Sequence, residues 1–316
     1  MKRKTLVVII TIGLFSLLIG GMELYYYVDN TEFLEEVNNM KSEFAIQTLV
    51  EHKVLEKENS TVHYFVSGKP DGQTILFLHP AFSDHSCFDR QIDYFSSEYR
   101  VITVDMLGHG LTEKSNSKDK ITMMSLYIAE ILETEQIEKI HVVGVSLGAL
   151  IAQDFALKFP QRILSLTGLG GYNINKEQKE IAKAQRNEVF KWLFKMIFSM
   201  TAFRKYIAER SVIGKNEQAH IYESSKNFSR SSFSVMTGMD GLIASRPNIE
   251  YPYPLLILAG EKDIPLAVAS AQLWHQDIPT SQFEIIQNAG HCANLDNALE
   301  FNKRLMSFLQ LKFSEN

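Results

Sequence analysis

The sequence Gly-Val-Ser-Leu-Gly at positions 144–148 constrains the fold of this chain more than any other feature. The residues that lead into it, Ile140–Val145, are mostly apolar and β-branched, which predicts a buried strand. The residues that follow, 147–159, carry apolar side chains at helical spacing and predict a helix. Gly144 and Gly148 therefore put small residues on both sides of Ser146, as a tight, strained turn from strand to helix requires.

The same order of strand and helix recurs along the chain. Residues 50–55 and 61–66 predict two strands around a polar turn, and helical stretches such as 122–134 separate several of the later strands. The other short apolar or β-branched runs are Thr74–Leu78, 101–105, Ile163–Leu169, 254–259 and 283–286. Fully apolar strands that alternate with helices predict a mostly parallel central sheet flanked by helices on both faces.

The alternation is interrupted once, between residues 172 and 249. This stretch has helical patterns, including 177–208, and no convincing strand, so we expect an inserted helical subdomain. Basic residues outnumber acidic ones there, although the whole chain has a formal net charge of −5. The acidic total makes nucleic acid a poor partner, and two cysteines exclude a disulfide scaffold or a Cys-rich metal site.

A serine in such a turn can act as a nucleophile when a base and an orienting carboxylate lie beside it. His291 follows the predicted strand 283–286 in the polar sequence Asn-Ala-Gly-His, and Asp263 follows the predicted strand 254–259. Both lie where open α/β sheets place their sites, at the carboxyl ends of strands. Glu261, two residues before Asp263, is the competing candidate for the carboxylate.

The three candidate residues occur along the chain in the order Ser146, Asp263, His291. In this order and in their predicted context, they resemble the α/β-hydrolase superfamily, in the branch with a helical cap inserted after the sixth strand. The resemblance covers roughly residues 50–311. It implies the α/β-hydrolase fold, with a core of residues 50–171 and 250–316 and a cap of residues 172–249. Asp105-Met106-Leu107-Gly108-His109-Gly110 is similar to a stretch that follows the family's fourth strand, and we expect a structural role for His109.

The sequence His79-Pro80-Ala81-Phe82-Ser83 resembles the family's loop after the third strand, which supplies one donor of an oxyanion hole. The resemblance implies that the backbone amides of Ala81 and Leu147 form the hole, with Phe82 as the reserve candidate. Pro80 stands where the family usually has glycine, and proline has no N–H to donate.

The resemblance implies a serine hydrolase that cleaves a carboxylic ester, thioester or lactone through an acyl-enzyme intermediate. Ser146 would be the nucleophile, His291 the base and Asp263 the orienting acid, with Gly144 and Gly148 forming the nucleophile elbow. A small-molecule acyl substrate and a monomer are expected, with no cofactor and no metal ion.

Two other classes of function remain open. Some relatives of this fold keep the three residues yet act as sensors or partner-binding proteins with little turnover, and Pro80 is the feature that points that way. Others catalyse perhydrolase, peptidase or carbon–carbon bond hydrolase chemistry on the same scaffold.

An almost continuous apolar strip, with Lys191 and Lys195 interrupting it, is formed by Phe190, Trp192, Leu193, Phe194, Met196, Ile197, Phe198 and Met200. A helix that is apolar nearly all round packs in a core, binds an acyl chain or contacts a membrane as a lid. Trp192, Phe194 and Phe198 are therefore, with Phe82, candidate substrate-binding residues.

The N-terminus has the pattern of a membrane signal. Lys2, Arg3 and Lys4 precede an uncharged run at 5–22. This predicts a single-pass anchor within residues 1–28 and a catalytic domain on the extracytoplasmic side of the cell membrane. The alternative is a cleaved signal peptide and a secreted protein. Residues 29–49, apolar at helical spacing, predict a stalk or packing helix.

Cys87 and Cys292 lie near the oxyanion loop and next to His291. We expect two unpaired thiols, with a disulfide between them as the alternative.

Overall fold

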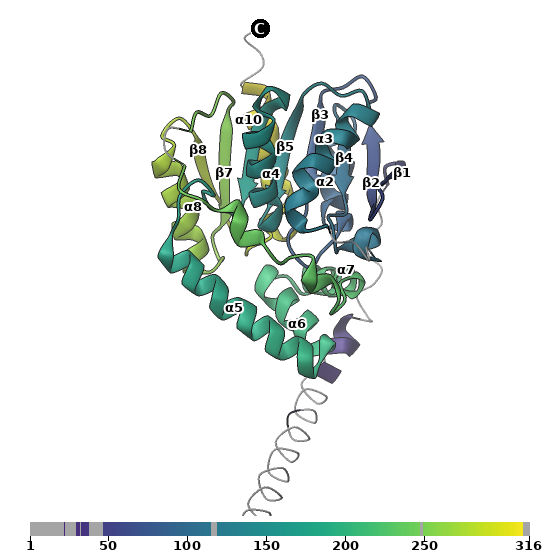
Figure 1. Ribbon diagram of the computed structural model, residues 1–316, viewed down its shortest axis with the longest axis vertical. Coiled ribbons are helices and arrows are strands. Elements are labelled where there is room, and N and C mark those ends of the chain that lie inside the picture. The colour runs from purple at the N-terminus through teal and green to yellow at the C-terminus, as the bar shows by residue number, and fades with distance from the viewer. Residues whose placement is uncertain are drawn as a thin grey trace, which may run out of the picture.

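The computed structural model describes residues 22, 30–31, 33–37, 47–114, 119–246 and 249–311. Its strands form one eight-stranded sheet in the order β1-β2-β4-β3-β5-β6-β7-β8 (Figure 1). The pairs β1–β2 and β2–β4 are antiparallel, and every later pair is parallel. The strands are β1 (Val50–Glu56), β2 (Thr61–Gly68), β3 (Thr74–Leu78), β4 (Arg100–Val104), β5 (Ile140–Val145), β6 (Ile163–Leu169), β7 (Leu255–Gly260) and β8 (Gln282–Ile286).

Helices cover both faces of this sheet. On one face α3 (Met124–Thr134) packs against α4 (Leu147–Lys158), and elsewhere α2 (Asp89–Phe95) packs against α10 (Ala298–Leu311). The helix α8 (Pro265–Asp277) packs on β7 and β8. Every residue of β3, β5 and β7 is buried, which is why these strands are mostly apolar, with Thr74 and His141 as the polar exceptions, rather than alternating. The predicted mostly parallel sheet flanked by helices is thus confirmed.

The predicted helical insertion after the sixth strand is also present. Between β6 and β7 the chain forms α5 (Lys179–Phe198), α6 (Met200–Ser211), α7 (Lys215–Ser224) and three 3₁₀ turns, which lie at one end of the sheet (Figure 1). The helical pattern at 177–208 is two helices rather than one. Ser199 separates them because its backbone is extended and its hydroxyl accepts a hydrogen bond from the Ala202 amide, which caps α6.

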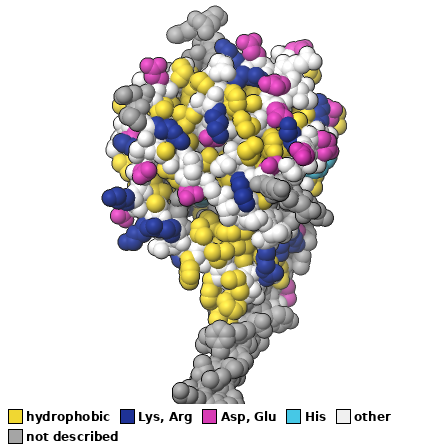
Figure 2. All heavy atoms as spheres, viewed as in Figure 1, with side chains coloured by type: hydrophobic (Ala, Val, Ile, Leu, Met, Phe, Trp, Pro, Cys, Tyr) yellow, Lys and Arg dark blue, Asp and Glu magenta, His cyan; other side chains and the backbone are white. Residues whose placement is uncertain are grey.

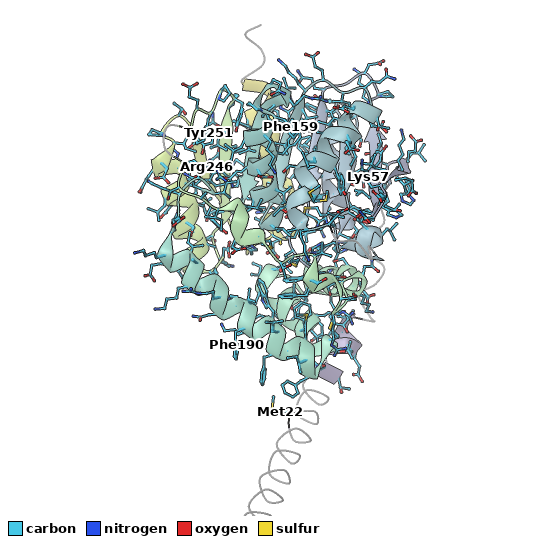
Figure 3. All side chains as sticks on the ribbon, viewed as in Figure 1. Met22, Lys57, Phe159, Phe190, Arg246 and Tyr251 are labelled. Carbon is cyan, nitrogen blue, oxygen red and sulfur yellow. The ribbon has the colours of Figure 1, made fainter. Side chains whose placement is uncertain are left out.

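The apolar strip of α5 is divided between two environments. Met196 is 4% exposed, whereas Phe190 is 71% exposed and Ile197 68%. Figure 3 shows Phe190 pointing away from the rest of the molecule, and hydrophobic side chains gather at this end of the surface in Figure 2. Phe194 and Phe198 pack on each other, with ring centroids 4.8 Å apart. Only part of the strip therefore belongs to the core.

The predicted membrane localisation must be corrected. No helix among the residues that the structure describes is long and apolar enough to cross a bilayer, so a single-pass membrane protein is not supported. The apolar run at 5–22 falls, apart from Met22, outside the described residues.

The described part of the predicted stalk, at 33–37, is helical and packs on the helical insertion. Phe33 and Val37 are buried there, and the Phe33 ring makes an edge contact with Tyr222 of α7 at 5.3 Å between centroids.

Candidate active site

Ser146 lies in the turn between β5 and α4, in a backbone conformation that only a tight turn imposes. Its φ is 52° and its ψ −113°, a combination that costs energy for any residue with a side chain. A Cβ at Gly144 would lie 2.3 Å from the backbone of Gly148, and one at Gly148 would lie 2.0 Å from the carbonyl oxygen of Leu78. Both positions therefore require glycine, and the turn holds Ser146 at the carboxyl end of β5.

Asp263 follows the carboxyl end of β7, and His291 follows that of the adjacent strand β8, where the two side chains meet. His291 Nδ1 lies 2.8 Å from Asp263 Oδ2, and Asp263 Oδ1 accepts a hydrogen bond from the Ile264 amide at 2.7 Å. The Asp263 side chain is only 2% exposed. The carboxylate of Glu261, the competing candidate, instead accepts a hydrogen bond from the exposed backbone N–H of Asn288 at 3.0 Å. The geometry therefore pairs His291 with Asp263.

The contact with Asp263 sets both the tautomer and the acidity of His291. A carboxylate beside Nδ1 favours the proton on that nitrogen and leaves Nε2 as the acceptor. Burial by itself lowers the pKa of His291, but the charge of Asp263 and its hydrogen bond raise it, and the net pKa lies above the ordinary 6.5. His291 is thus a stronger base than an isolated imidazole.

Ser146, Asp263 and His291 line one cavity of about 140 Å³. The oxyanion-loop residues Pro80, Ala81 and Phe82 also line it, and the helices α5 and α6 form its other wall, with Glu188, Trp192, Tyr206, Ile207, Arg210 and Ser211. Phe194 and Phe198 are not among the lining residues. A larger cavity of about 650 Å³ lies between β2 and α2 and brings together no serine, histidine and carboxylate of this kind.

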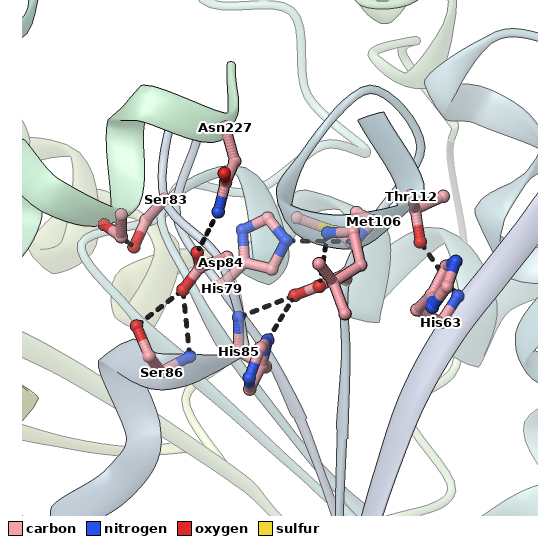
Figure 4. Close-up of polar contacts among 12 residues, drawn as sticks. His63, His79, Ser83, Asp84, His85, Ser86, Met106, Thr112 and Asn227 are labelled. Atoms are coloured by element: carbon pink, nitrogen blue, oxygen red, sulfur yellow. Dashed lines mark hydrogen bonds and ion pairs between the residues drawn. The ribbon is translucent and has the colours of Figure 1, made fainter. Parts of the chain in front are cut away.

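His79 makes two hydrogen bonds that fix the start of the predicted oxyanion loop, residues 79–83. Its Nε2 accepts a hydrogen bond from the Met106 amide at 3.0 Å (Figure 4). Its Nδ1 therefore carries the proton and donates to the Pro80 carbonyl at 2.7 Å. The Pro80 carbonyl and the Ala81 N–H belong to one planar peptide and point in opposite directions. The hydrogen bond from His79 to the Pro80 carbonyl therefore directs the Ala81 N–H away from His79. The loop thus keeps a backbone donor at Ala81, although Pro80 supplies none.

Phe82 anchors the same loop to the helical insertion. Its backbone has a φ of 67°, and its ring, 2% exposed, makes edge contacts with Trp192, Phe203 and Phe228 at 4.9, 5.1 and 4.9 Å between centroids. The position of the oxyanion loop is thus coupled to that of α5 and α6. Leu147, the other predicted donor, is the first residue of α4, where the N–H has no partner within the helix.

Residues 105–110 support the segment 79–85 through hydrogen bonds. Asp105 is buried and accepts hydrogen bonds from the amides of His85 and Leu111, each at 2.8 Å. His109 is fully buried beside Phe228, and burial lowers its pKa to about 3, so it is neutral and bonds the Leu107 carbonyl. Its surroundings are those of a structural residue.

Asp296 was not singled out by the sequence, yet it holds the His291 loop in place. Its carboxylate accepts hydrogen bonds from the amide of Gly290 at 2.8 Å and from those of Ile213 and Gly214, just after α6, at 2.9 and 3.0 Å. It thereby ties the loop to the helical insertion. Its position five residues after His291 is visible in the sequence, but its partners at 213–214 are not.

Gly170, at the end of β6, is a second residue that sequence reasoning missed. Its φ is +63°, and a Cβ there would lie 2.9 Å from Cε1 and 3.0 Å from Nδ1 of His291. We expect Gly170→Ala to displace the imidazole and to lower kcat/KM for an ester by about a hundredfold, as a misplacement of about 1 Å does.

The matched control is Gly238→Ala. Gly238 also has a positive φ, +91°, but a Cβ there meets nothing within 4 Å. Gly238→Ala should introduce the same kind of backbone strain as Gly170→Ala and lower the Tm, but it should not lower kcat/KM. Equal losses of activity in the two variants would show that strain alone accounts for the effect at Gly170.

Cys87 and Cys292 are both buried and unpaired in the structure. Burial, together with the charge of Asp296, raises the pKa of the Cys292 thiol, so it is protonated at neutral pH. Within the ranges that the structure describes, no three His, Cys, Asp or Glu side chains form a group that could hold a metal ion.

Comparison with known proteins identifies the fold. The family model for the α/β hydrolase fold matches residues 73–194. A 2-hydroxy-6-oxononadienedioate/2-hydroxy-6-oxononatrienedioate hydrolase of Paraburkholderia phymatum is 26% identical over 78% of this chain and 90% of its own length. An uncharacterized carboxylesterase of Bacillus subtilis is 24% identical over 78% of this chain and 82% of its own length.

Solved structures show the same fold. A structure from a study of carboxylesterases of the thaumarchaeon Nitrososphaera gargenis superposes with a TM-score of 0.70, at 18% identity, over 84% of this chain and all of that one. The relatives and structural neighbours include carboxylesterases and other hydrolases. The chain has the α/β-hydrolase fold, as its sequence predicted.

Proposed function

We propose that this protein, with its α/β-hydrolase fold, is a serine hydrolase that cleaves a carboxylic ester, thioester or lactone of a small molecule through an acyl-enzyme. One observation carries the proposal: the His291–Asp263 pair and the strained Ser146 turn line the same cavity. Residues 50–171 and 250–316 would be the core that carries this chemistry, and residues 172–249 the cap that shapes the substrate cavity.

In the proposed reaction, Ser146 Oγ attacks the acyl carbonyl carbon while His291 Nε2 takes its proton. The Ala81 and Leu147 amides donate to the oxyanion of the tetrahedral intermediate, which collapses as His291 returns the proton to the leaving alcohol. A water molecule, deprotonated by His291, then attacks the acyl-enzyme and releases the acid. Asp263 keeps Nδ1–H of His291 in place and stabilises the imidazolium in both halves of the reaction.

Labelling with a fluorophosphonate probe tests the nucleophile directly. We expect the wild-type protein and the Ser211→Ala variant to be labelled, and the Ser146→Ala variant not to be. Ser211 is the matched control because it lines the same cavity but lies at the end of α6, not at the strand-to-helix turn. Equal labelling of Ser146→Ala and wild type would rule out the proposed nucleophile.

The alternative, a sensor or partner-binding protein with little turnover, draws on Pro80, which removes one N–H from the oxyanion loop. It predicts that an ester raises the Tm of the protein without being hydrolysed. The orientation of the Ala81 N–H by His79 favours the enzyme, since the loop keeps a donor at the next residue.

A further inference from the structure

We propose that the substrate carries a second, anionic group and that Arg210 of α6 binds it. The inference rests on the proposed hydrolase function, and it names the class of ester: a short one with a carboxylate or similar oxyanion besides the scissile bond. It comes from the wall of the catalytic cavity that α5 and α6 supply.

That wall combines the apolar side chains of Trp192 and Ile207 with charged and polar ones, which a pocket for a plain alkyl chain would not need. Glu188, Tyr206 and Arg210 line the cavity together with Ser146 and His291. Arg210 and Ser146 line the same cavity, whose volume is about 140 Å³. A charged side chain on its wall is therefore close to whatever binds there.

Glu188 is already satisfied by neighbours other than Arg210. Its Oε1 accepts a hydrogen bond from Lys191 Nζ at 2.8 Å, and its Oε2 accepts one from the Tyr206 hydroxyl at 2.7 Å. Burial tends to raise the pKa of Glu188, but these two bonds lower it below its ordinary value, so the group is ionised. The charges of Lys191 and Arg210 also lower the pKa of Glu188, so this one carboxylate lies between two cations.

Arg210 remains as the surplus cation. Its Nη2 lies 3.8 Å from Glu188 Oε1, close enough for attraction but too far for a hydrogen bond. Within the part of the chain that the structure describes, its guanidinium makes no hydrogen bond, so its donors are available to a ligand. A guanidinium presents its N–H groups in a planar fork that fits a carboxylate or a phosphate.

The backbone next to Arg210 is also tied to the loop that carries the catalytic base. The Cys292 amide, which follows His291, donates a hydrogen bond to the carbonyl of Ser211, which follows Arg210, at 2.7 Å. Asp296 bonds both the His291 loop and the residues just after α6. The charge of Arg210 reaches the imidazole, because it lowers the pKa of His291 against the rise that Asp263 causes. Because Arg210 and Ser146 line the same cavity, one ligand can contact both.

A matched pair of substrates tests the proposal. Ethyl hydrogen glutarate and ethyl valerate have the same acyl chain, but the first ends in a carboxylate and the second in a methyl group. We expect wild-type kcat/KM to be about tenfold or more higher for the charged ester, as one charge-assisted pair provides. Ethyl 4-phosphonobutyrate is the third substrate and separates a phosphate-like from a carboxylate preference.

Arg210→Gln should abolish the preference, so that the ratio of kcat/KM for ethyl hydrogen glutarate to that for ethyl valerate falls to about one. Lys205→Gln is the control because it removes the same charge from the same helix, at a residue that does not line the cavity. It should keep the preference. No preference in the wild type, or an equal loss on both esters in Arg210→Gln, would overturn the proposal.

A binding measurement separates this inference from the proposed reaction. Glutarate should raise the Tm of Ser146→Ala more than glutaramide does, and the double variant with Arg210→Gln should lose that difference. If no ester is hydrolysed but glutarate still binds through Arg210, the reaction is wrong and the anion site stands. If esters are hydrolysed without regard to charge and glutarate does not bind, the anion site is wrong.

Discussion

Ser146→Ala should lower kcat for ester hydrolysis at least about ten-thousand-fold, because the remaining oxyanion donors and substrate binding cannot replace a covalent nucleophile. The measurement is steady-state hydrolysis of a short activated ester by the two purified proteins. KM should change much less than kcat, since the cavity keeps its shape. A loss of less than about tenfold would exclude the acyl-enzyme through Ser146.

The fold should be unaffected by this change. Alanine and serine meet the same strain at a φ of 52°, so the backbone cost is common to both proteins. The Tm of Ser146→Ala should therefore remain within a few degrees of the wild type, and a large fall would mean that the loss of activity reflects unfolding rather than chemistry.

Asp263→Asn should lower kcat about a thousandfold to ten-thousand-fold and should also change its dependence on pH. An amide at position 263 can donate a hydrogen bond to His291 Nδ1, which favours the tautomer that carries its proton on Nε2. In that tautomer Nε2 cannot accept the proton of Ser146. The geometry of the pair, 2.8 Å in the wild type, can be kept while the chemistry is lost. A matched crystal structure of the variant would check that the imidazole has not moved.

The direction of the pH effect follows from the pKa of His291. The base must be neutral to accept the serine proton, so activity falls as the pH falls through this pKa. Asp263 raises the pKa of His291 above its ordinary value, so the acid limb of wild-type kcat/KM lies above pH 6.5. In Asp263→Asn the raising charge is gone, and the residual activity should persist to lower pH.

Glu261→Gln is the control for this experiment. Glu261 was the competing carboxylate in the sequence, but it bonds the exposed Asn288 amide and not His291. Its removal should leave kcat and the acid limb near the wild-type values. A large loss in Glu261→Gln, with Asp263→Asn nearly unaffected, would reverse the assignment of the orienting acid.

The sequence anticipated the local structure around Ser146 because short-range sterics determine it. Only glycine fits at 144 and 148, where a Cβ would meet backbone atoms, so the turn is visible as a motif. The apolar runs likewise predicted the strands to within two residues at each end, since burial on both faces favours apolar side chains. The break between α5 and α6 was missed because a serine inside an apolar pattern does not by itself stop a helix.

The expected localisation failed for a different reason. A run of uncharged residues after a basic cluster predicts a membrane span from composition alone, but no helix of the described residues meets the length and hydropathy of one.

The sequence by itself determined the alternating order of strands and helices, the strained serine turn and the three residues most suited to its chemistry. Each of these depends on neighbours along the chain or on the burial of whole strands. Only the tertiary structure decided that His291 pairs with Asp263 rather than Glu261, that Gly170 leaves space for the imidazole and that Arg210 faces the same cavity. These are contacts between segments tens of residues or more apart, and the loops and helices that make them are positioned by packing, which leaves no periodic trace in the sequence.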